Sequence, residues 1–192
     1  MSKVDPNWRP VAFKEWQLVA EAIGEGGQSV LLRKGGISEG KAGFQWLHEQ
    51  FFLFPSFFHE QDDQVKTRLD GSKRNLAKEG WSDDHISFSV FVETVATGRI
   101  TTWEEVQRLD PYHIWAENTV RERFDWGDEP GISYAVIRAF LLRDPWVLKN
   151  RKGFGGCRSW IGLPAEEGGN WREQLDNADQ IELSCEYPEW LM

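Results

Sequence analysis

Hydrophobic and polar positions alternate with two different periods along the first part of the chain. Between Val11 and Ile23 apolar residues recur every three or four positions, which is typical of an amphipathic helix. The glycine-rich stretch from Gly24 to Gly27 is expected to end this helix, because glycine adopts the left-handed C-cap conformation without a Cβ penalty. The continuous apolar run from Ser29 to Arg33 then predicts a buried strand.

Strand-like patterns dominate the middle of the chain. Apolar runs at 44–47 and 51–54 predict one strand, bent near His48 and ended by Pro55. The period-2 alternation from Ile86 to Gly98 predicts a second, half-buried strand.

Helical signals follow these strands. Thr102 lies three residues before Glu105, the spacing of a capping box, which predicts a helix from Trp103 to Leu109. The sequence Asp110-Pro111 ends it, and a looser helical pattern covers residues 114–124.

The longest predicted strand runs from Ile132 to Leu142 and ends at Asp144-Pro145. Arg138 lies within it, and a charge in so apolar a run is costly unless it is paired. Either a carboxylate such as Glu15 or Glu93 neutralises Arg138, or Arg138 has a functional role.

These elements predict an α+β fold: a single domain with a mixed, partly closed β-barrel and short peripheral helices. We assign residues 1–164 to this domain. Residues 165–192 form an acidic C-terminal extension packing on or beside it, with a further strand predicted at 180–184.

Composition narrows the class of protein. Of 192 residues, 40% are apolar, enough for a core, and the 11 Trp and 12 Phe can fill that core or line a binding surface. The only cysteines, Cys157 and Cys185, have neither disulfide-framework nor zinc-site spacing. With no signal-peptide pattern at the start and no apolar run long enough to span a membrane, we expect a cytoplasmic protein without a membrane partner.

Charge is distributed unevenly. The net charge is -9, and residues 165–192 hold eight acids against one base, so the remaining 164 residues are close to neutral. Basic residues gather at 65–80 and 149–158, either as binding patches or as solvated surface segments. This distribution argues against indiscriminate binding to phosphate backbones.

The sequence Arg33-Lys34-Gly35-Gly36 is the strongest candidate for anion recognition. It follows a buried strand directly, so a rigid scaffold would present its charges. A guanidinium can contact phosphate or carboxylate with two donors, an ammonium adds a point charge, and glycines leave backbone N–H groups accessible. The alternative is a hairpin whose cations are merely solvated.

His48 and His59 are each followed by glutamate and lie eleven residues apart. With Asp62 or Asp63 they could supply metal ligands, although the spacing matches no known ligand motif. They could equally cap strand ends, and we predict no metal and no cofactor.

The loop that ends in Cys157-Arg158-Ser159-Trp160 carries a thiol beside cations, which would lower the pKa of that thiol and favour a nucleophile. No partner base is evident, so a small structural residue in a tight loop is the alternative. The preceding glycines lack the lysine and hydroxyl of a phosphate-binding loop.

Several of these segments occur together in one known family. The ordered set FKEW, LRKGGI, HEQFFLFPSFFHEQ and GGCRSW, spread from Phe13 to Leu163, resembles the bacterial domain-of-unknown-function family 1802. Ser56 stands where such proteins usually have threonine. The order of elements is also similar to the PUA, ASCH and EVE barrels, and that resemblance implies binding of RNA or modified bases in a cleft lined by aromatic and basic residues.

The leading functional hypothesis is a binding module for a nucleic acid (RNA or DNA) or a nucleotide. Arg33 and Lys34 would contact phosphate, Trp46, His48 or Trp160 would stack on a base, and Gly35, Gly36, His59, Arg158 and Ser159 would complete the site. The alternatives are a metal- or His-dependent phosphoester hydrolase and a protein-interaction adaptor that uses the acidic tail. The sequence leaves the oligomeric state open.

Overall fold

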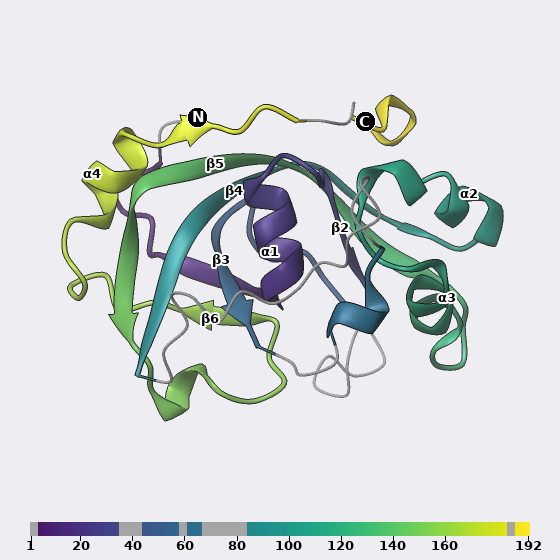
Figure 1. Ribbon diagram of the computed structural model, residues 1–192, viewed down its shortest axis with the longest axis horizontal. Helices are drawn as coiled ribbons and strands as arrows, with labels where there is room; N and C mark the ends of the chain where they lie inside the picture. Colours follow the sequence, from purple (N-terminus) through teal and green to yellow (C-terminus); the bar gives the residue numbers. More distant parts are fainter. Residues whose placement is uncertain (1–3, 35–43, 58–60, 67–83, 184–186) are drawn as a thin grey trace.

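The computed structural model describes residues 4–34, 44–57, 61–66, 84–183 and 187–192. Within them the fold is mixed α+β, with seven strands in one sheet and four short α-helices (Figure 1). The elements in chain order are β1 (Val11–Trp16), α1 (Gln17–Gly24), β2 (Val30–Arg33), β3 (Gln50–Ser56), β4 (His85–Ile100), α2 (Trp103–Gln107), α3 (Glu117–Asp125), β5 (Ile132–Lys149), β6 (Trp160–Gly162), α4 (Trp171–Asp176) and β7 (Asp179–Gln180).

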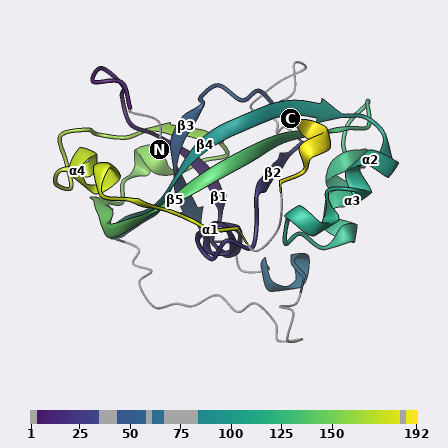
Figure 2. The same cartoon turned by 90° about the horizontal axis from the view of Figure 1, so that it is seen from above.

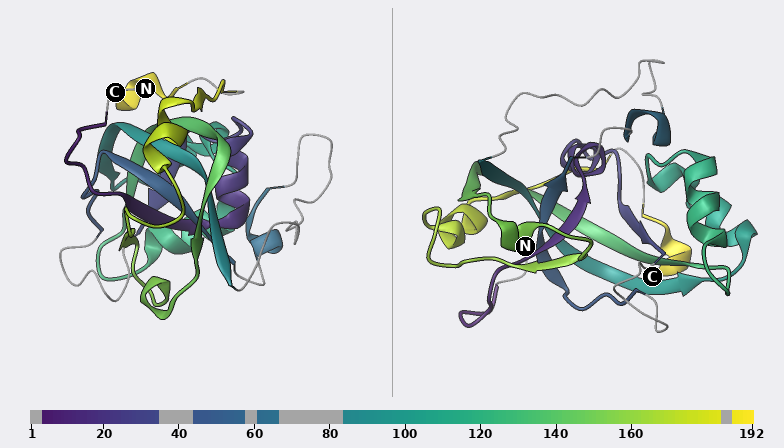
Figure 3. Two further views of the ribbon diagram at one scale, coloured as in Figure 1. Left: turned by 90° about the vertical axis from the view of Figure 1, so that its left-hand side faces the viewer. Right: turned by 90° about the horizontal axis from the view of Figure 1, so that it is seen from below.

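The strand order in the sheet is β2-β5-β4-β3-β1-β6, and β7 pairs with β5. Among the described strands only β1 and β3 run parallel, and the other pairs are antiparallel. Seen from the end that carries α4, the sheet curls into a barrel-like cross-section (Figure 3, left). The sheet does not close among the described residues, since its end strands β2 and β6 do not pair. The predicted fold class, a mixed and partly closed barrel with short helices, is confirmed.

The two longest strands organise the molecule. β4 and β5 have 16 and 18 residues, and together they arch over α1 (Figure 1). Helices α2 and α3 lie together at one end of these strands and α4 lies at the other (Figure 2).

The curled sheet separates two apolar cores, which we call the inner and the outer core. The inner core lies under α1, α2 and α3 and includes Phe13, Leu31 and Val92. The outer core lies on the opposite face and includes Phe52, Phe91 and Trp146. Both cores are rich in buried aromatic rings, so many of the Trp and Phe residues of the chain fill the cores.

The first predicted element is only half helical. Residues 11–16 form strand β1, and the helix begins at Gln17. β1 lies between β3 and β6 and is covered on both faces. Its successive residues Val11, Ala12 and Phe13 are therefore all buried. Tertiary pairing therefore overrides the helical spacing of the apolar residues. The helix ends in the predicted glycine stretch, where Gly26 has φ +76°.

Other boundaries differ from the prediction as well. Residues 44–47 form no strand, and β3 begins at Gln50. β5 does not stop at Asp144-Pro145 but continues to Lys149 through an irregular register opposite Ser89.

Two local predictions have defined outcomes. Arg138 pairs with Glu93, its neighbour across the β4–β5 ladder, with Nη1 3.7 Å from Oε2. At the start of α2 the Thr102 hydroxyl donates to Glu105 Oε2 at 2.5 Å, so these side chains bond each other and not the backbone N–H groups of a capping box.

The C-terminal extension lies against both cores. Trp171 and Leu175 of α4 are buried in the outer core, and β7 adds to β5. Tyr187, Trp190 and Leu191 pack against the inner core. Among the described residues no helix has the length and apolar character needed to cross a membrane.

Candidate nucleic-acid interface

Aromatic side chains converge on Phe13 in the middle of β1. The ring centroids of Trp46, Phe51 and Trp160 lie 5.2, 5.6 and 4.8 Å from that of Phe13. Phe44 lies 5.9 Å away. We call Phe13, Phe44, Trp46, Phe51 and Trp160 the aromatic cluster. The aromatic cluster joins β1, β3, β6 and the segment before β3. Phe13 and Trp160 are neighbours because they lie directly opposite each other in the β1–β6 pair.

His48 extends the aromatic cluster toward the surface. Its ring packs edge-on against Trp160 at 4.9 Å. Burial lowers the pKa of His48, so the imidazole is neutral at pH 7. Trp160 is half-buried and donates its indole N–H to the backbone oxygen of Gln45 at 3.4 Å. Trp160 and His48 are thus partly exposed members of this aromatic region.

Arg33 also packs on Phe13. Its guanidinium carbon is 4.6 Å from the Phe13 ring centroid, and its Nη2 donates to the backbone oxygen of Lys14. Nη1 forms an ion pair with Glu15 Oε2 at 3.3 Å. The Glu15 side chain is fully buried and that of Arg33 is 18% exposed, so the pair sits just beneath the surface.

A second arginine, Arg123 of α3, approaches the same carboxylate. Its guanidinium carbon lies 3.6 Å from the Trp115 ring centroid and 5.4 Å from that of Trp16. Burial, and then the Arg33 cation, lower the pKa of Arg123 to about 10 against the opposing effect of Glu15. Arg123 therefore remains charged at neutral pH. We call Glu15, Arg33 and Arg123 the arginine cluster.

The arginine cluster has incomplete hydrogen bonding. Two guanidinium groups face one carboxylate, and both Arg123 Nη1 and Glu15 Oε2 are buried without a hydrogen-bond partner in the part of the chain that the structure describes. Trp115 Nε1 and Trp46 Nε1 are likewise buried without a hydrogen-bond partner among the described residues. An unpaired buried donor costs about 1–3 kcal/mol, and more when it is charged. The arrangement can accept an anion that supplies the missing acceptors and offsets the excess positive charge.

The structure brings together four of the residues predicted for the site: Arg33, Trp46 and Trp160 pack on Phe13, and His48 packs on Trp160. Gly35, Gly36 and His59 lie outside the described residues.

Lys34 is engaged within the protein. Its ammonium donates to the backbone oxygens of Phe124, Glu129 and Gly131, each at 2.9 Å. Burial lowers its pKa. Because an ammonium has three hydrogens, these bonds use its donor capacity, and Lys34 holds the end of α3 and the following turn instead of presenting a charge.

Arg158 and Ser159 lie at the edge of this region. Arg158 is exposed and donates to the backbone oxygen of Gly153 at 2.5 Å, while the Ser159 carbonyl accepts from the N–H of Lys14 at 2.8 Å. The Lys14 ammonium in turn donates to the carbonyl of Gly156 at 2.9 Å. These bonds fix the loop before β6 and so position Trp160.

For the predicted metal alternative, the described residues contain no group of three His, Cys, Asp or Glu side chains arranged to hold an ion. Cys157 is exposed.

Sequence reasoning did not identify Arg123. The signal was present: in α3 the buried positions Thr119, Val120 and Phe124 define one face, and Arg123 lies on that face between them. A single arginine on the apolar face of an amphipathic helix requires either a partner or a ligand.

Comparison with solved structures places the fold among PUA-like barrels. An ASCH protein from Zymomonas mobilis matches with a TM-score of 0.51 and 14% identity, over 91% of this chain and 99% of that one. A serine-to-alanine variant of that protein matches with a TM-score of 0.50 and 12% identity, over 91% and 100% of the two chains. A tyrosine-to-phenylalanine variant gives 0.50 and 13%, over 90% and 100%. The predicted architectural likeness is confirmed, and at these identities it concerns the fold alone.

Comparison of sequences is more specific about the family. No curated protein sequence matches the chain. The model of a family described as a domain of unknown function, DUF1802, matches residues 12–179, so the likeness extends beyond Leu163 into the acidic extension, farther than predicted. Since that match spans most of the chain, the protein belongs to the DUF1802 family.

Proposed function

We propose that this protein binds single-stranded RNA, with a phosphate at the arginine cluster and a base against the aromatic cluster. The observation that carries the proposal is the buried Nη1 of Arg123, which lacks an acceptor among the described residues beside a second arginine and only one carboxylate.

The neighbouring aromatic cluster supports a nucleic acid over a simple anion. Trp160 and His48 lie on the same Phe13-centred cluster that Arg33 covers. Base–aromatic stacking contributes about 1–3 kcal/mol per base and suits unpaired bases, whereas bases in a duplex are already stacked. The likeness to PUA-like barrels favours RNA over DNA by analogy of fold.

The charge distribution determines how strongly the protein is expected to bind RNA. Since residues 1–164 are nearly neutral, few phosphates are contacted, and affinity depends on one well-placed phosphate and on stacking. Indiscriminate binding to long polyanions is not expected.

The test is fluorescence anisotropy with labelled single-stranded RNA, single-stranded DNA and duplex RNA of equal length. Arg123→Gln removes the unpaired donors and one charge, and is expected to weaken RNA binding about tenfold or more, since a charge-assisted hydrogen bond contributes about 1.5–3 kcal/mol. Arg121→Gln is the matched control, because Arg121 lies two residues away on the same helix, is exposed, and pairs with Asp125.

The proposal fails if wild-type protein binds none of the three nucleic acids at low ionic strength. It also fails if the Arg121 and Arg123 variants lose affinity equally, since that result would mean a general charge effect. Amide NMR spectra of each variant verify that the fold is retained.

A further inference from the structure

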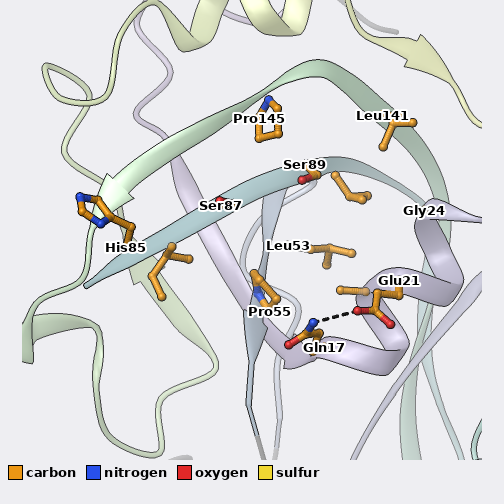
Figure 4. A pocket seen from close by; sticks show the side chains of 13 residues that line it. Gln17, Glu21, Gly24, Leu53, Pro55, His85, Ser87, Ser89, Leu141 and Pro145 are labelled. Atoms are coloured by element: carbon orange, nitrogen blue, oxygen red, sulfur yellow. Dashed lines mark hydrogen bonds between the residues drawn. The ribbon is translucent and has the colours of Figure 1, made fainter. Parts of the chain in front are cut away.

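A pocket of about 400 Å³ lies between α1 and the long strands (Figure 4). α1 forms one wall with Gln17 and Glu21, β3 contributes Leu53 and Pro55, and β4 forms the opposite wall. No residue of the arginine cluster or of the aromatic cluster lines it.

The pocket exists because one short helix covers a long curved sheet. α1 has eight residues, about 12 Å, whereas β4 has sixteen residues and extends about 50 Å. Of the described elements, only α1 packs on this face near the pocket, and the helix ends before it reaches the far half of β4 and β5.

Strand alternation turns polar residues of β4 toward this space. Ile86 and Phe88 face the outer core, so Ser87 and Ser89 face the inner side, where they line the pocket (Figure 4). The β4–β5 register shifts beside them, because Phe88 lies opposite Trp146 whereas Val90 lies opposite Leu141. Ser89 therefore stands opposite four residues of β5, 142–145, and Leu141 and Pro145 line the pocket from that strand.

The lining differs chemically from the candidate RNA interface. Among the residues that the structure describes, it contains no Trp, Phe or Tyr and no Lys or Arg. Its polar groups are the two serines, His85 and the pair in which Gln17 Nε2 donates to Glu21 Oε1 at 2.8 Å. With an acid and no cation, the lining disfavours a phosphate or carboxylate and favours a ligand that carries N–H donors.

We propose that this pocket binds an amino-bearing nucleobase, whose exocyclic amine donates to Glu21 while another edge faces the serine hydroxyls. A carboxylate has about four acceptor positions, so Glu21 can accept from a ligand and from Gln17 together. The choice of a nucleobase among amino heterocycles rests on the proposed function.

The arrangement of polar and apolar groups in the lining favours a flat ring over an alkylammonium chain. The pocket volume falls within the roughly 300–1,000 Å³ of small-molecule sites. Polar groups lie on two facing walls, α1 and β4, between apolar walls formed by residues such as Leu53 and Leu141 (Figure 4). A base has polar edges for both walls and apolar faces for the rest, whereas a lysine side chain has one polar end.

The test uses free nucleosides, which lack phosphate, and monitors amide NMR shifts and calorimetry. Adenosine, guanosine and cytidine carry an exocyclic amine and uridine does not. We expect at least one of the three to bind about tenfold or more tightly than uridine and to shift the amides of Ser87 and Ser89. Glu21→Gln should reduce that binding about tenfold, and Ser87→Leu, which fills the pocket, should abolish it.

Glu25→Gln is the matched control, since Glu25 is exposed just beyond the same helix and does not line the pocket. The inference is overturned if no nucleoside binds at millimolar concentration, or if the Glu21 and Glu25 variants bind equally well. RNA binding that survives without nucleoside binding leaves the proposed function intact. Nucleoside binding without RNA binding would overturn the proposed function and leave the assignment of the pocket intact.

Discussion

At the level of single residues, the partners of a cation decide its role more than its position in a motif does. Lys34 belongs to the conspicuous Arg33-Lys34-Gly35-Gly36 sequence, yet three backbone oxygens occupy its ammonium. Arg123 belongs to no motif, yet its Nη1 is buried without an acceptor among the described residues. The sequence showed where positive charge lies, but which charge is satisfied depends on carbonyl groups about ninety residues away.

His113 makes the stability of the fold sensitive to acid. Burial, and then Lys66, lower its pKa to about 3, although Asp110 acts in the opposite direction. The unfolded imidazole, with a pKa near 6.5, takes up a proton first, so this contribution is complete above pH 6.5 and is lost as the pH falls from 6.5 toward 3.

We expect His113→Leu to flatten this dependence. The unfolding free energy of the wild type minus that of the variant should fall by a few kcal/mol between pH 7 and pH 4, as measured by urea denaturation. This difference can change sign within that range. His85→Leu is the control, because it makes the same substitution at a histidine that is exposed. Parallel pH profiles for His113→Leu and wild type would contradict the prediction.

At the level of elements, periodicity predicted the interior strands and missed where elements change. The alternation at 86–98 and the apolar run at 132–142 are both inside real strands. Pro145 did not end β5, because the register of the ladder shifts there opposite Ser89. Residues 11–16 carry helical spacing but lie between two strands, and no single-chain pattern reveals that neighbourhood.

The acidic extension illustrates how charge can conceal packing. Its eight acids suggested a peripheral tail, whereas Trp171 and Leu175 are 4% and 1% exposed in the outer core. The carbonyl of Glu167 also accepts the indole N–H of Trp146 at 2.8 Å. The domain boundary at 164 stays a prediction, and these contacts favour one cooperative unit that extends through α4.

Trp171→Ala tests that view. Removing a buried indole is expected to lower the unfolding free energy by about 3–5 kcal/mol, measured by urea or thermal denaturation with a single transition. Trp126→Ala is the matched control, because Trp126 is 66% exposed and its removal should change the stability by less than about 0.5 kcal/mol. Equal, small effects would show that the extension is dispensable.

At the level of the whole molecule, a curved sheet with two cores presents two chemically distinct surfaces. One combines Arg33 and Arg123 with the partly exposed rings of Trp160 and His48. The other is a pocket lined by Glu21 and two serines, with no Trp, Phe or Tyr among its described residues. The sequence predicted the aromatic half of the first surface, through Trp46, His48 and Trp160. Its cationic half comes partly from α3, and the second surface depends on a helix shorter than the strands it covers.

The salt dependence of RNA affinity tests the central claim most directly. For a single strand, the slope of log K against log salt changes by about 0.7 for each phosphate contact. Arg123→Gln should weaken binding and reduce the slope by about this amount, because it removes a phosphate contact. Trp160→Ala should weaken binding with the slope unchanged, because it removes stacking. Equal slopes for wild type and Arg123→Gln, over 50–300 mM salt as a rough working range, would contradict the assignment of phosphate binding to the arginine cluster.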